Sequence, residues 1–81
     1  MPRHMTYRQI ADDLAARIAA GEYPPDAKLP SYTQLAALYS VSVATIQRAL
    51  LVLEVKDLVR GHVGRGVYVT ATTTAEELHH G

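Results

Sequence analysis

The stretch from Leu29 to Leu53 constrains the fold of this chain most, because its pattern predicts two short helices joined by a tight turn. Ser31 is placed to cap the first helix, and Gln34 follows three residues later, as a capping box requires. Ser42 is placed to cap the second helix by accepting a hydrogen bond from a backbone amide two or three residues further on. Two helices joined in this way form a helix-turn-helix, whose second helix enters the major groove of DNA.

The second helix of the pair, expected from Val43 to about Lys56, has one face suited to the protein core and one suited to DNA. On the polar face, Gln47 can form two hydrogen bonds with adenine, and Arg48 can contact guanine or phosphate. Val43 and Ala44 present small apolar groups that can meet a thymine methyl group. For each residue the alternative is an ordinary surface position. The buried stripe is expected to consist of Ile46, Ala49, Leu50 and Leu53.

Another helix is predicted before this pair, over Tyr7–Ala20, where apolar residues recur every three or four positions. Gly21 suits the left-handed conformation that often ends a helix. The Pro24–Pro25 pair prevents continuation and indicates an extended turn. Lys28–Leu29 is expected to form a very short strand before the helix-turn-helix begins.

A β-hairpin is predicted after the last helix. Two β-prone runs, Leu58–Arg60 and Val67–Thr70, flank the glycine-rich loop Gly61–Gly66. Three helices followed by a hairpin predict a mainly α fold with a small β-hairpin, the winged helix-turn-helix. We expect the wing tip to display His62 and Arg65 toward a phosphate backbone or a minor groove.

Charge is distributed unevenly, although the 81-residue chain has a net charge of zero. Residues 31–47 carry no charged side chain, and residues 48–70 carry four basic and two acidic ones. The only local basic excess therefore lies on the second helix of the pair and just after it, where a DNA-binding surface would need it.

Other classes of protein are disfavoured by the composition. The chain contains no cysteine, which excludes disulfides and thiolate metal sites. Its four histidines, His4, His62, His79 and His80, lack metal-site spacing, and no catalytic motif is present, so we expect no metal, no cofactor and no enzyme activity. No apolar run approaches the roughly 20 residues that span a bilayer, and the first residues do not form a signal peptide, so a cytoplasmic protein is expected. We expect one domain over residues 1–70 and a flexible tail or linker over residues 71–81.

In the order and spacing of several segments, the chain resembles the DNA-binding domain of the GntR family of bacterial transcription regulators. The resemblance covers about Tyr7 to Thr70, through YRQIADDLAARIAAGEYPP, LPSYTQLAALYSVS, TIQRALLVLE, and DLV followed by GRGVYV. It implies a sequence-specific DNA-binding regulator, with repression as the expected mode. Family members pair this domain with a larger C-terminal domain that binds a small metabolite and helps dimerisation. We expect this effector domain to be missing here, so that the chain is either part of a longer protein or an unusually short stand-alone member. We therefore expect a monomer that occupies a two-half-site operator as a pair.

The chain departs from the family pattern at several positions. Family members often have arginine where this chain has Thr33, Val43 and Gln47, and commonly have glycine where it has Ser40 and Asp57. The missing arginines keep one alternative open, a winged-helix module that binds protein and has little affinity for DNA.

We expect DNA contacts from the start of the helix over Tyr7–Ala20, from both helices of the pair and from the wing. Free amides at a helix N-terminus bind phosphate, which adds the start of the first helix of the pair to this surface. The expected DNA-binding residues are Arg8, Ser31, Tyr32, Thr33, Ser42, Val43, Ala44, Thr45, Gln47, Arg48, His62, Gly64, Arg65 and Gly66.

Overall fold

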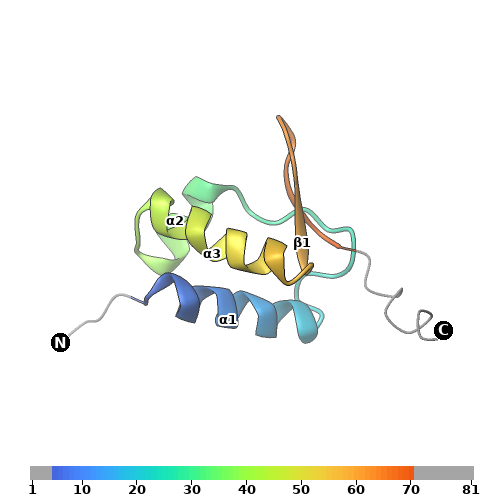
Figure 1. Cartoon of the computed structure of the whole chain (residues 1–81), viewed down its shortest axis with the longest axis horizontal. Helices are drawn as coiled ribbons and strands as arrows, with labels where there is room; N and C mark the ends of the chain where they lie inside the picture. Colours follow the sequence, from blue (N-terminus) through green and yellow to red (C-terminus); the bar gives the residue numbers. More distant parts are fainter. Residues whose placement is uncertain (1–4, 71–81) are drawn as a thin grey trace.

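A computed structural model describes residues 5–70, which fold as three helices and an antiparallel hairpin (Figure 1). This arrangement confirms the predicted winged helix-turn-helix. The predicted tail, residues 71–81, lies outside the described residues. The elements in chain order are α1 (Tyr7–Ala19), α2 (Tyr32–Tyr39), α3 (Val43–Val55), β1 (Val59–His62) and β2 (Gly66–Val69).

Helix α1 begins and ends where local sequence signals place it, to within one residue. The Thr6 hydroxyl accepts a hydrogen bond from the backbone amide of Gln9, and the Gln9 side chain accepts one from the Thr6 amide. This capping box satisfies amides that the first helical turn leaves without partners. The helix ends at Ala19, one residue before the predicted end, and Gly21 adopts the expected left-handed conformation with φ of 86°.

Helix α3 lies at the centre of the domain, between α1 on one side and α2 and the hairpin on the others (Figure 1). Its predicted stripe of four apolar residues is buried, which confirms the assignment of the core face. Val59, Val67 and Val69 from the hairpin join the same core. The buried core consists of Ile10, Ala11, Leu14, Leu29, Leu35, Ala36, Ile46, Ala49, Leu50, Leu53, Val59, Val67 and Val69.

A polar cluster ties α1 to the end of α2. The Tyr39 hydroxyl donates to Asp13 Oδ2 over 2.6 Å, and Arg17 Nε donates to the same oxygen over 2.8 Å. Arg17 also donates to Glu22 over 2.7 Å. The Tyr39 hydroxyl and the Arg17 guanidinium favour the charged carboxylate and hold the pKa of Asp13 below its ordinary value. Because Asp13 and Tyr39 are 26 positions apart, this cluster helps set how α2 lies on α1.

The hairpin is longer at its tip than the sequence indicated. The predicted boundary between strand and loop at Gly61 was wrong, because the strand pairing continues to His62 opposite Gly66. His62 therefore lies in β1, and its ring packs edge-on against Tyr68, with centroids 5.2 Å apart. The second strand ends at Val69, one residue before the predicted end. Arg65 donates its amide to the His62 carbonyl over 2.9 Å and closes the turn.

The segment before the helix-turn-helix pairs with β2 along the edge that β1 does not occupy. Lys28 forms an isolated bridge opposite Tyr68, and Leu29 donates its amide to the Val67 carbonyl over 2.8 Å. The Val69 amide donates to the Ala27 carbonyl over 2.9 Å. The very short strand expected at Lys28–Leu29 is thus present as one bridge, and it holds the wing against the body of the domain.

Candidate nucleic-acid interface

The candidate interface begins at the N-terminus of α2. The Ser31 hydroxyl accepts from the Gln34 amide over 3.1 Å, and the Gln34 side chain accepts from the Ser31 amide over 2.8 Å, which confirms the predicted capping box. With these two positions engaged, Tyr32 and Thr33 remain exposed on the first turn. The structure therefore presents the start of α2 at the surface, as a phosphate contact requires.

The turn between α2 and α3 depends on a left-handed residue. Ser40 has φ of 56° and ψ of 47°, a conformation that glycine adopts most easily. Asp57, after α3, has φ of 64°. These are the two positions where the resemblance implied glycine, so the structure explains that preference. Across the turn, the axes of α2 and α3 differ in direction by 105°, within the range of helix-turn-helix pairs.

No single helix within residues 5–70 has both the length and the apolar character to cross a membrane. Only α2 and α3 taken together, across their sharp bend, reach that length and composition.

The cap of α3 leaves its first turns facing outward. The Ser42 hydroxyl accepts from the Thr45 amide over 3.2 Å and lies 3.1 Å from the Thr45 hydroxyl. Of the two amides that the sequence allowed, the one three residues after Ser42 is therefore the partner. The predicted start at Val43 is confirmed, and the helix ends at Val55 with Lys56 as its C-cap. Four residues in its N-terminal half are exposed: Val43, Ala44, Gln47 and Arg48.

The wing rises beside α3, and its tip is a turn over residues 63–65 (Figure 1). Gly64 has φ of 76° and Gly66 has φ of 116°, conformations that L side chains rarely adopt. Arg65 is exposed at the tip, and Val63 is fully exposed. The predicted display of Arg65 is therefore consistent with the structure. His62 is the last residue of β1 and lies just before the turn at the tip, not in it.

An interaction that the sequence did not indicate holds the wing to α3. Glu54 Oε2, from the last turns of α3, accepts from the Gly61 amide of β1 over 3.2 Å. A Cβ atom on Gly61 would lie 3.1 Å from that oxygen, so the absence of a side chain favours this approach. The bond relates the direction of the wing to that of α3, and only the packing of two separate elements reveals it.

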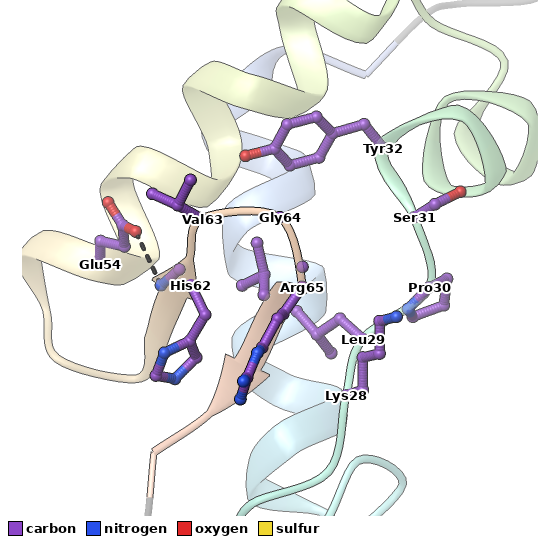
Figure 2. A pocket seen from close by; sticks show the side chains of 13 residues that line it. Lys28, Leu29, Pro30, Ser31, Tyr32, Glu54, His62, Val63, Gly64 and Arg65 are labelled. Atoms are coloured by element: carbon purple, nitrogen blue, oxygen red, sulfur yellow. Dashed lines mark hydrogen bonds between the residues drawn. The ribbon is translucent and has the colours of Figure 1, made fainter.

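Between the wing and the start of α2 lies an open groove of about 630 Å³ (Figure 2). One wall is the wing, with Arg65 on it, and the other is the segment that leads through Pro30 into Ser31 and Tyr32. The structure thus brings the predicted wing residues together with Ser31 and Tyr32 at the start of α2, whereas Thr33 and the predicted residues of α3 do not line this groove. It does not bring Arg8 to this groove: Arg8 lies at the start of α1, with its guanidinium 5.8 Å from the centre of the Tyr7 ring.

Ion pairing separates the basic residues into two groups. Within residues 5–70, ion pairs engage Arg17, with Asp13 and Glu22, and Arg60, with Asp57 over 3.6 Å. Arg48 and Arg65 are exposed, and neither has an acidic partner in that part of the chain. These two arginines are therefore available to an external anion such as a phosphate.

Within residues 5–70, no group of three or more His, Cys, Asp or Glu side chains is arranged to hold a metal ion. His4, His79 and His80 lie outside the described residues.

Comparison with known proteins gives one consistent result. Residues 6–69 match the profile of the family described as "Bacterial regulatory proteins, gntR family". The mannosyl-D-glycerate transport/metabolism system repressor MngR of Escherichia coli is 38% identical over 63 residues, which cover 78% of this chain and 26% of MngR. The chain spans less than a third of the length of the curated relatives that it matches.

Two solved structures with at least 30% sequence identity to this chain show the same fold. A GntR family transcriptional regulator from Listeria monocytogenes superposes with a TM-score of 0.80 at 33% identity, covering 91% of this chain and 66% of that one. The DNA-binding domain of AraR, in complex with operator ORR3, superposes with a TM-score of 0.76 at 30% identity, covering 79% of this chain and 77% of that one.

Proposed function

The chain belongs to the GntR family of bacterial regulatory proteins, and on that premise we propose that it binds operator DNA as the DNA-binding domain of a transcription repressor. The observation that carries the proposal is the exposed N-terminal half of α3, capped by Ser42 and free of acidic residues, beside a wing that carries Arg65. Such a helix fits the major groove, and a basic wing fits the adjacent phosphate backbone. The AraR domain bound to operator ORR3 supports DNA as the ligand, and the name of MngR supports repression.

The parts of the interface have distinct roles in this proposal. Gln47, Arg48, Val43 and Ala44 contact base edges in the major groove. The capped N-termini at Ser31–Thr33 and Ser42–Thr45, together with the wing residues His62, Gly64, Arg65 and Gly66, contact phosphates, and Arg8 contributes a flanking backbone contact. Phosphate contacts supply affinity, and contacts to base edges supply sequence preference.

The proposal extends to the organisation of the protein. Residues 1–70 act as the DNA-binding domain, and residues 71–81 are a tail or the start of a linker. The isolated domain is monomeric, and two copies occupy half-sites about one turn of DNA, or a multiple of it, apart.

A salt titration tests the proposal. The protein is titrated into a fluorescent duplex of mixed sequence at 50 and 200 mM salt, and anisotropy reports binding. We expect log K to fall linearly with log salt concentration, with a slope of about −0.9 for each phosphate that the protein contacts. Absent binding, or binding that does not respond to salt, would contradict the proposal and favour the protein-interaction module instead.

A further inference from the structure

Lys28 stands in the groove between the wing and α2, at a place where the sequence suggested only a short strand. Its backbone is fixed by the bridge opposite Tyr68 and by the hydrogen bond from the neighbouring Leu29 amide to the Val67 carbonyl. Leu29 is buried in the core and Lys28 is exposed, as alternate positions on an extended segment are. The lysine is therefore presented from a backbone that is anchored on both sides.

The aliphatic stem of Lys28 lies against the wing at Gly66. A Cβ atom on Gly66 would lie 2.8 Å from Lys28 Cε and 3.8 Å from Cδ, which is closer to Cε than carbon atoms approach without displacement. A side chain at this position would therefore displace the end of the lysine, and the φ of 116° at Gly66 independently favours glycine. The end of the Lys28 side chain thus lies beside the wing, and the residue as a whole is exposed, as long cationic side chains that cover a surface commonly are.

The charge of Lys28 has no partner among residues 5–70, where the ion pairs engage only Arg17 and Arg60. The carboxylate that lines the same groove, Glu54, accepts from the Gly61 amide instead. Figure 2 shows Lys28 on the wall of the groove next to Pro30, with Arg65 on the wing. The ammonium group therefore lies between the start of α2 and the wing.

We propose that Lys28 binds a DNA backbone phosphate in the gap between the contacts of α2 and those of the wing. This inference rests on the proposed function and adds a residue to it. A lysine ammonium acts as a point charge toward phosphate and does not distinguish bases. Lys28 consequently strengthens binding to every sequence alike, and it makes the wing and the helix-turn-helix contact one continuous stretch of backbone.

The test compares Lys28→Gln, which keeps most of the stem and removes the charge, with wild type on the mixed-sequence duplex. We expect the slope of log K against log salt to become shallower by about 0.9, the value for one phosphate. The advantage of wild type over the variant should therefore shrink about 3.5-fold between 50 and 200 mM salt, because a fourfold change in salt raised to the power 0.9 is about 3.5. Lys28→Arg should restore the slope.

Lys56→Gln is the matched control, because Lys56 is another exposed lysine without a described ion pair but lies at the C-cap of α3, outside the groove. It should leave the slope unchanged. Thermal melts of all variants establish that each is folded. A wild-type slope in Lys28→Gln, or an equal loss in Lys56→Gln, would overturn the assignment of Lys28 while DNA binding itself stands. A wild type that shows no salt-dependent binding would overturn both proposals.

Discussion

Replacing Gln47 with arginine is expected to change which base pairs the protein selects. Gln47 is exposed on α3, one helical turn after Val43, so the two residues lie on the same face. No hydrogen bond within residues 5–70 engages the Gln47 side chain. The substitution should therefore cost little in folding, and its effect should appear in DNA binding.

The direction of the change follows from donor and acceptor geometry. Glutamine offers one acceptor and one donor group, which match the amino group and ring nitrogen of adenine, and Val43 offers a methyl surface for thymine. The wild-type half-site should therefore be rich in A·T pairs at the contacted positions. The arginine fork matches the two acceptors of guanine, so Gln47→Arg should shift preference toward G·C.

The size of the shift depends on whether both hydrogen bonds form. A good bidentate contact contributes about 1–3 kcal/mol of discrimination against the wrong base. At about 1.4 kcal/mol for each factor of ten, this corresponds to a change in relative affinity of about 5- to 140-fold. A contact with phosphate or water alone would give no change in relative affinity.

Selection from randomised duplexes, run in parallel on both proteins, measures this shift. Leu38→Arg adds the same charge at an exposed position on another helix, α2, and serves as the control for a general gain in affinity. That variant should enrich the same bases as wild type. If Gln47→Arg also enriches the same bases at every position, Gln47 does not contact bases and the reasoning is refuted.

Three further predictions concern the core, the polar cluster and the wing. Leu50→Ala removes a side chain that is only 3% exposed and should lower the free energy of unfolding by about 2–5 kcal/mol; a melting temperature within a degree or two of wild type would show that the core face is misassigned. Because the folded state lowers the pKa of Asp13 from its ordinary 3.8, its contribution to stability is complete above that value and is lost as the pH falls through the folded pKa. Melting temperatures measured from pH 6 to pH 2 should accordingly fall more steeply for wild type than for Tyr39→Phe, and parallel curves would contradict this. Arg65→Ala should weaken binding to all duplexes and make the salt slope shallower by about 0.9, whereas an unchanged slope would count against a wing contact.

The sequence by itself determined the order and the limits of the helices. Caps at Ser31 and Ser42 and the apolar stripe through Leu50 are interactions within a few residues, so their pattern is visible in a single sequence. The left-handed position at Gly21 was also predicted locally. Together with the two β-prone runs around the glycine-rich loop, these features were enough to predict the winged helix-turn-helix and to place α3 as the candidate recognition helix.

Only the tertiary structure decided how the elements meet. The bond from Tyr39 to Asp13, the bond from the Gly61 amide to Glu54 and the packing of Lys28 on Gly66 join residues on separate elements. No local propensity specifies such pairs, because each depends on the relative placement of elements that the shared core sets. The relative placement of elements also explains why His62 lies in β1 and not in the expected loop, because its pairing with Gly66 depends on both strands. The groove that holds Lys28 and Arg65 exists only once the wing, α3 and the start of α2 are packed together.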